Sequence, residues 1–398
     1  MPQETEHFSW KEHHVLQGDG RGGFVVHPAE YQFVPRFGEF KVLPFGLSAM
    51  DNGEILLMGA ARTGKGPSAY GEMVATISAD GGATWSAYET VGYGAAVRLT
   101  YLGGGTLCRH GDGPTAAAAP GLYFSHDYGR TWPEKVPLPQ TPSGKIWSSE
   151  GNGLVDRDAR GRATLVGWTS GHRPDDVDDK PWGSWPSCAF VCWSHDGGRT
   201  FENYSYPEAW KWTDTFAGQT WERSCSDGAL VRAANGWIVA AKRMDVPARY
   251  IDYHYDSFTG TGVSISRDEG KTWSPIRHVL EAGRHHANLH CLANGDLVLS
   301  AVRRLDIRGD RLASYRLGCD ALVSHDHGLS WNADRMYILD DWPHLHHRDL
   351  GAVTWETGDM WYGCASGHLA SVCLEDGSLI TTYGHYAYGG ALIKWRPA

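Results

Sequence analysis

One octapeptide occurs five times along the chain, with the pattern Ser-x-Asp-x-Gly-x-(Thr or Ser)-(Trp or Phe). In a segment of this kind the Asp carboxylate accepts hydrogen bonds from nearby backbone amides, and the Gly supplies a positive φ angle. The aromatic side chain then packs beneath the turn. The pattern therefore predicts five similar turns between β-strands. Its copies span residues 78–85, 125–132, 194–201, 266–273 and 324–331.

A second repeat precedes each octapeptide: an apolar stretch, a tight polar turn and another apolar stretch. Turns of the Asn-Gly or Asp-Gly type between apolar stretches are typical of β-hairpins. Six such hairpins are expected, and the last has no octapeptide after it. They span residues 47–60, 97–110, 153–168, 230–241, 289–300 and 370–383.

A hairpin, a strand, the octapeptide turn and a further strand make four antiparallel strands, which is one blade of a β-propeller. We therefore predict an all-β, six-bladed β-propeller in a single domain, 1–398. Residues 1–39 form an N-terminal closing segment, in which residues 23–35 supply the outer strand of the last blade. A seventh blade within residues 1–40 is the weaker alternative. The blades span residues 40–95, 96–142, 143–218, 219–282, 283–342 and 343–398.

Composition excludes several classes of partner. The net charge is −10, from 36 basic and 46 acidic residues, and so no basic surface for nucleic acid is expected. No apolar run reaches the roughly 18 residues of a membrane span, and no apolar signal segment opens the chain. We expect a cytoplasmic protein, or a secreted one whose signal has been removed. The eight cysteines form no Cys-x-x-Cys pair, and neither a metal nor a cofactor is expected.

Propeller geometry indicates where a binding site would lie. The innermost strand of each blade starts at the mouth of the central funnel, and the next strand returns there. Positions about eight residues before each hairpin turn are Pro44, Ala96, Asn152, Asp227, His286 and His368. Positions on the returning strands include Arg62, Arg109, His110, His172, Arg243, Arg303, Arg304, Tyr383 and His385. Ionisable residues are common here, where a buried strand would otherwise favour apolar ones.

The octapeptide resembles the Asp-box of the sialidase superfamily, whose members are β-propellers that mostly cleave glycosidic bonds. The resemblance places Asp227 at the family's glutamate, Arg243 at its second arginine and His368 at its tyrosine nucleophile. Val42 stands at the first arginine of the family, and no Asp follows Arg62 at the position of the general acid. The resemblance therefore implies a sialidase fold with a rebuilt active site.

These residues suggest three functions, all with a glycan as partner. The first is a sialidase-like exo-glycoside hydrolase acting on a terminal acidic sugar. The second is a polysaccharide lyase with a His base and an Arg that binds a uronate. The third is a non-catalytic glycan-binding propeller. The expected catalytic residues are His368, His286, Asp227 and Tyr383. The expected substrate-binding residues are Arg243, Arg303, Arg304, Asn152, Arg62, Arg109, His110, His172 and His385.

Overall fold

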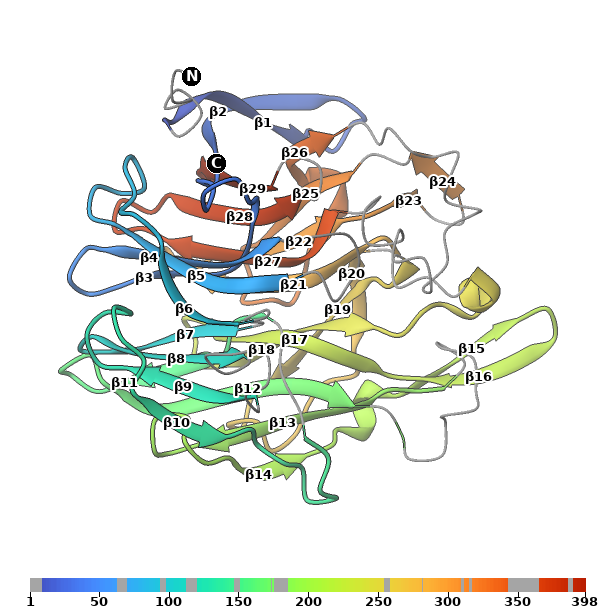
Figure 1. Ribbon diagram of the computed structural model, residues 1–398. Coiled ribbons are helices and arrows are strands. Elements are labelled where there is room, and N and C mark those ends of the chain that lie inside the picture. Colours follow the sequence, from blue (N-terminus) through green and yellow to red (C-terminus); the bar gives the residue numbers. More distant parts are fainter. Residues whose placement is uncertain are drawn as a thin grey trace.

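The protein is an all-β, propeller-like arrangement of four-stranded antiparallel sheets (Figure 1). The structure, a computed structural model, describes residues 9–62, 70–93, 98–111, 120–146, 151–172, 174, 185–253, 258–280, 282–308, 311–314, 317–342, 365–385 and 389–398. Helix in these ranges is limited to short 3-10 turns, and none of it is long and apolar enough to cross a membrane.

Four of the predicted units are separate four-stranded sheets, each running in chain order from the inside outwards. The first sheet contains β3 (Val42–Ala49), β4 (Ile55–Arg62), β5 (Tyr70–Ser78) and β6 (Glu89–Tyr93). The second contains β7 (Arg98–Gly103), β8 (Thr106–Gly111), β9 (Gly121–Ser125) and β10 (Glu134–Pro137). The third contains β11 (Leu154–Arg157), β12 (Ala163–His172), β13 (Cys188–Ser194) and β14 (Glu202–Ser205). The fourth contains β17 (Cys225–Arg232), β18 (Ile238–Met244), β19 (Thr261–Ser266) and β20 (Arg277–Leu280).

The remaining two units share one nine-stranded sheet, which the sequence did not predict. The fifth unit contains β21 (Arg284–Cys291), β22 (Leu297–Arg303), β25 (Leu317–Ser324) and β26 (Tyr337–Trp342). The sixth contains β27 (Ala365–Cys373), β28 (Leu379–His385), β29 (Gly389–Trp395) and the N-terminal β2 (Phe24–Phe33). β2 pairs with β29, at the place expected for the closing strand. The additional strand β1 (Lys11–Gly18) pairs with both β2 and β26 and so joins the two units.

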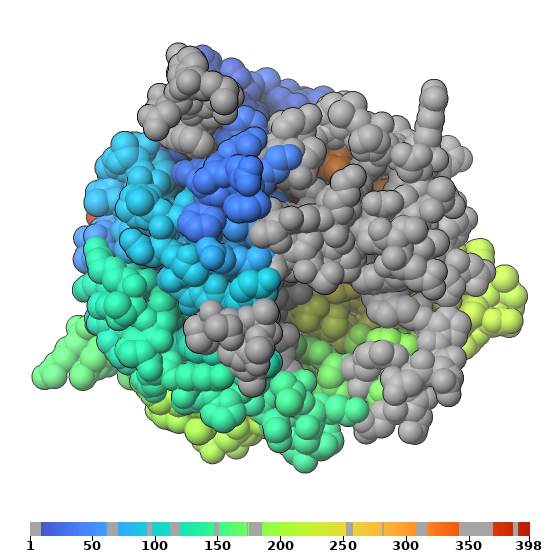
Figure 2. All heavy atoms as spheres, viewed as in Figure 1, coloured from blue at the N-terminus to red at the C-terminus, as the bar shows by residue number. Residues whose placement is uncertain are grey.

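Packing between neighbouring units forms the hydrophobic core. A buried apolar cluster lies between each unit and the next, as between Leu122 of the second sheet and Phe190 of the third. The sixth unit packs against the first in the same way, through Val372, Leu392 and Leu57. The units therefore close into a ring. Figure 2 shows the N-terminal segment and the first and second sheets following one another across one face.

All five octapeptides form the predicted turn, between the third and fourth strands of their units. In the third sheet, Asp196 accepts hydrogen bonds from Ser194 Oγ (2.7 Å), the Thr200 amide (2.9 Å) and Thr200 Oγ1 (2.6 Å). The Gly198 φ angle is 85°, as the pattern requires. These bonds hold the pKa of the Asp196 carboxyl below its usual value, although burial opposes the shift. The octapeptide is thus a local structural motif.

Replacing this carboxylate is expected to weaken the fold moderately. The Asp196→Ala variant should lose about 1–2 kcal/mol of unfolding free energy, because the amides it binds lose their acceptor. Urea unfolding measures the change. Asp334→Ala is the control, since Asp334 is exposed and its carboxylate accepts no side-chain hydrogen bond among the described residues. Equal stability of Asp196→Ala and the parent would contradict a stabilising role for the turn.

The two ends of the ring differ. The hairpin turn follows the first strand of each unit, and the octapeptide follows the third. Both strands run in the same direction, and so the hairpin turns and the octapeptides lie at the same end of the ring. Two hairpins project from the opposite end, at the right of Figure 1. One is β15 (Trp212–Phe216) with β16 (Gln219–Arg223), and the other is β23 (Asp306–Arg308) with β24 (Arg311–Ser314). The sequence did not predict these insertions as strands.

Candidate active site

A cavity of about 250 Å³ lies where the third and fourth sheets meet, at the end opposite the octapeptides. The start of β17 contributes Asp227, the end of β18 contributes Arg243 and the end of β12 contributes His172. These strand ends come together because the first strand of a unit starts, and the second ends, at the same edge. Three residues that the sequence predicted for the funnel therefore share one cavity.

Asp227 and Arg243 form an ion pair in this cavity. Arg243 Nη1 lies 3.3 Å from Asp227 Oδ2, and Arg243 Nε donates to Thr259 Oγ1 at 3.3 Å. The Asp227 side chain is 20% exposed and the Arg243 side chain is 14% exposed. Both therefore reach the cavity, although most of each side chain is shielded from water. A guanidinium at the wall of a cavity is a group that binds the carboxylate or hydroxyl groups of ligands.

His286 is buried close enough to Arg243 and Asp227 for their charges to act on it, and its backbone conformation is unusual. Its φ angle is +54°, within a shift of the β21–β22 register between His285 and Asn288. Positive φ is uncommon for residues other than glycine, and such strain concentrates at functional sites. Burial lowers the pKa of His286 well below its ordinary value, and the charges of Arg304 and Arg243 lower it further. His286 is therefore a neutral imidazole at neutral pH.

His285 was not predicted by the sequence analysis, although it adjoins His286. The two rings lie 4.4 Å apart between centroids, and His285 Nδ1 lies 3.3 Å from the Thr259 carbonyl oxygen. Thr259 thus contacts His285 through its backbone and Arg243 through its hydroxyl. The contacts connect the ion pair to the histidines through one residue of the loop before β19.

Several histidines have low pKa values, which predicts loss of stability in acid. Burial lowers the pKa of His290 to about 4, whereas the unfolded residue titrates near 6.5. Below about pH 6.5 the unfolded chain binds a proton that the native state does not. Stability therefore falls as pH decreases towards 4, by up to about 1.4 kcal/mol per pH unit for each such histidine.

Urea unfolding at neutral and acidic pH checks this expectation. His290→Gln should lose less stability on acidification than the parent, and His126→Gln, at a half-exposed histidine on the surface, should behave like the parent. Parallel losses in all three proteins would contradict the assignment.

Trp185 and Asp245 also line the cavity, and the sequence analysis missed Asp245. Asp245 accepts hydrogen bonds from the Ser187 amide (3.0 Å), Ser187 Oγ (2.6 Å) and the Ser224 amide (2.7 Å). Burial raises the pKa of this carboxyl, although the hydrogen bonds oppose the shift. Asp245 follows Arg243 by two positions, and residues two apart in an extended chain face the same side. This spacing was the signal in the sequence that could have placed Asp245 beside Arg243.

Two buried cations lie close to the cavity. Lys242 donates to Thr169 Oγ1 at 2.6 Å and to the Ser170 carbonyl at 3.2 Å, and burial lowers its pKa to about 8. Arg98 donates to the Gly151 carbonyl at 3.1 Å, and burial lowers its pKa to about 9. The charge of Asp227 favours the protonated form of both, so this carboxylate lies in a positive field.

The other predicted residues take different places. Arg304 is buried close enough to His286 for its charge to lower the histidine's pKa. Asn152 bonds to the backbone of Leu289 in both directions at 2.8 Å and so ties the third unit to the fifth. His110 is half-buried in β8, and burial lowers its pKa to about 4.

Three predicted residues lie in the interior rather than at the cavity. Arg109 packs over the Tyr123 ring and donates to the Val91 carbonyl at 2.6 Å, between the first and second sheets. Arg303 is 3% exposed and is bound by carboxylates of the fifth unit. Tyr383 is fully buried and donates its hydroxyl to Asp340 at 2.5 Å. Successive side chains of a strand point to opposite faces of the sheet, and these three point into the packed interior.

Three further predictions concern side chains that lie outside the described part of the structure. The backbones of Arg62, His368 and His385 belong to β4, β27 and β28, respectively. Their predicted roles remain predictions. Within the described ranges, no group of three or more His, Cys, Asp or Glu side chains is arranged to hold a metal.

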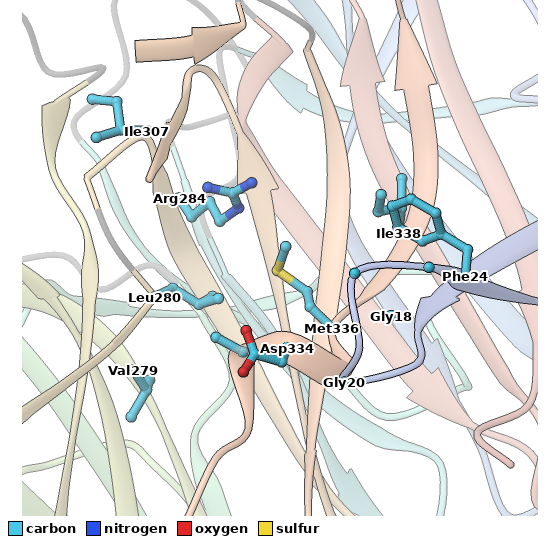
Figure 3. A pocket seen from close by; sticks show the side chains of 13 residues that line it. Gly18, Gly20, Phe24, Val279, Leu280, Arg284, Ile307, Asp334, Met336 and Ile338 are labelled. Carbon is cyan, nitrogen blue, oxygen red and sulfur yellow. The ribbon is translucent and has the colours of Figure 1, made fainter. Parts of the chain in front are cut away.

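A different cavity, of about 410 Å³, lies between the β1–β2 turn and the outer strands of the fourth and fifth units (Figure 3). Aliphatic side chains such as Leu280, Met336 and Ile338 surround it. Its buried cation, Arg284, is already bound to two carboxylates. The smaller cavity presents more ionisable groups to a ligand, and so it is the better candidate for chemistry.

No protein-family model matches the sequence, and a search of curated proteins finds no match. The fold is similar to that of a protein of unknown function from Dyadobacter fermentans, with 16% identity, 92% of this chain and 98% of that chain covered, and a TM-score of 0.59. It is similar to the Hadza microbial sialidase Hz136, with 15% identity, coverage of 94% and 70%, and a TM-score of 0.58. It is also similar to the α-L-arabinofuranosidase Arb93a from Fusarium graminearum, with 12% identity, coverage of 92% and 96%, and a TM-score of 0.53. At these identities the likeness concerns the fold.

Proposed function

We propose that the chain is a carbohydrate-active enzyme, a glycoside hydrolase that cleaves a terminal acidic sugar in the cavity of Asp227, Arg243 and His172. In this proposal the fold is a six-bladed propeller, and the nine-stranded sheet counts as two blades. The observation that carries the proposal is the partly exposed Asp227–Arg243 ion pair, which lines a cavity rather than a surface. The similarity in fold to a sialidase and an arabinofuranosidase supports it.

Hydrolysis assigns a role to each group. Arg243 binds the carboxylate of the sugar. The carboxylate of the bound sugar replaces Asp227 as the partner of Arg243, and the two neighbouring negative charges then favour a proton on Asp227. Asp227 transfers that proton to the departing oxygen when the glycosidic C–O bond breaks. An imidazole takes a proton from the water whose oxygen bonds to the anomeric carbon, and the candidates for this step are His172, which lines the cavity, and the buried His286.

A lyase is the second candidate, favoured by the neutral state of His286 near Arg243. Arg243 then neutralises a uronate carboxylate, which acidifies the adjacent C–H bond. The imidazole takes that proton, a carbon–carbon double bond forms and the C–O bond to the departing sugar breaks. The leaving oxygen gains a proton, and no water is consumed.

One assay distinguishes the candidates. The protein is incubated with sialylated oligosaccharides and with oligosaccharides that contain a uronate glycosylated at O4, and reducing ends are measured together with the ultraviolet absorbance of an unsaturated uronate. Reducing ends without the chromophore support the hydrolase, whereas both signals together indicate the lyase. Binding of these oligosaccharides without either signal would overturn the proposal in favour of a glycan-binding protein.

A further inference from the structure

A groove of about 710 Å³ lies beside the candidate active site. The β15–β16 hairpin forms one wall through Trp212, Glu222 and Arg223. The opposite wall comes from the start of β13 and from Tyr206, which follows β14. The hairpin is an insertion between the third and fourth sheets, and so the groove is an addition to the repeating architecture.

The groove adjoins the cavity through shared residues. Ser187 lines both spaces, and Ser224 of the groove donates its amide to Asp245 of the cavity. The Tyr206 ring lies edge-on to the His172 ring, with centroids 6.2 Å apart and an interplanar angle of 82°. A chain-like ligand that leaves the cavity past His172 therefore meets Tyr206 next.

The lining of the groove combines aromatic faces with polar groups. Tyr206 retains 38% of its exposure, and Trp212 is half-buried. Lys211 and Glu208, which are paired at 2.6 Å, stand with Glu222 along the groove. Aromatic rings offer an apolar face at low entropic cost, and nearby charged groups bind hydroxyls. A glycan, with apolar C–H faces and hydroxyl edges, suits both features.

We propose that this groove is a second sugar-binding site, which holds the sugar units next to the one bound in the cavity. The inference rests on the proposed function for the chemistry of its ligand. It makes the substrate an oligosaccharide or polysaccharide chain, because a single terminal sugar with a small leaving group would leave the groove empty.

The test compares substrates of two lengths. Tyr206→Ala is assayed on a terminal sugar that carries only a small leaving group and on a longer oligosaccharide with the same terminal sugar. Loss of the stacking face is expected to lower kcat/KM for the longer substrate about tenfold, mainly through KM, and to leave the substrate with the small leaving group unaffected. Tyr206→Phe keeps the face and should retain most of the activity. Phe216→Ser, at the exposed tip of the same hairpin and outside the groove, is the matched control.

The outcomes separate the groove from the proposed function. Equal losses on both substrates, or no loss on either, would overturn the groove as a sugar site. If the parent protein cleaves neither substrate, the proposed function fails, and calorimetric titration with the longer oligosaccharide tests the groove alone. The groove is supported if the parent protein binds the oligosaccharide, the Tyr206→Ala variant binds it more weakly and the Phe216→Ser variant binds it as the parent does. Absence of binding, or equal binding by all three proteins, overturns it.

Discussion

Asp227→Asn is expected to reduce kcat/KM on the substrate that the protein cleaves by about a thousandfold, with little effect on folding. The amide keeps the size of the side chain but neither transfers the proton nor carries the charge that pairs with Arg243. The loss should appear mainly in kcat, since proton transfer belongs to the transition state. Initial rates measured over a range of substrate concentrations separate the effect on kcat from the effect on KM.

Asp158→Asn is the control for this variant, because Asp158 pairs with Arg162 in the turn between β11 and β12, at the octapeptide end of the ring. It should retain parental activity. Circular dichroism and thermal unfolding verify that both variants fold. If Asp227→Asn folds normally and keeps more than about a tenth of the activity, Asp227 does not transfer the proton.

Asp320→Ala is expected to have the largest effect on stability, a loss of about 3–5 kcal/mol of unfolding free energy. Asp320 is fully buried and accepts from Arg284 Nε at 2.8 Å and from Arg303 Nη1 at 3.0 Å. Its removal leaves two guanidinium groups in the interior without the carboxylate they share. Of the two carboxylates that bind it in the described part of the chain, Arg284, visible beside the cavity in Figure 3, then keeps Asp306 at 2.6 Å.

Chemical denaturation measures this loss, with Glu269→Gln as the surface control. Glu269 pairs with Arg232 at 2.8 Å but is 62% exposed, and so its replacement should change stability by less than about 1 kcal/mol. A loss in Asp320→Ala no larger than in Glu269→Gln would show that the buried network does not stabilise the fold.

Local patterns explain why much of the fold was predictable. The octapeptide makes its hydrogen bonds within eight residues, for example from Asp196 to Ser194 and Thr200. The hairpins are equally local, as in the bond from the Gly53 amide to the Met50 carbonyl at 3.0 Å. The register of the hairpins made it possible to count outwards to Asp227 and Arg243, which do meet in the structure.

The same counting failed where partners come from distant parts of the chain. Arg303 and Tyr383 are at the expected distances from their turns, but each faces a carboxylate in the interior, Asp320 and Asp340. Position along a strand does not reveal which face a neighbouring unit covers. Asp245 was missed for a related reason, since its hydrogen-bond donor Ser187 lies 58 residues away.

The sequence by itself determined the repeating unit, its antiparallel strands and the turns between them, because those interactions form between residues close together in the chain. Only the tertiary structure decided which ionisable side chains share a cavity, which of them form buried ion pairs, and how β1 joins the last two units. These outcomes depend on how separate units pack around the ring, and that packing brings together residues whose separation in sequence carries no signal of contact.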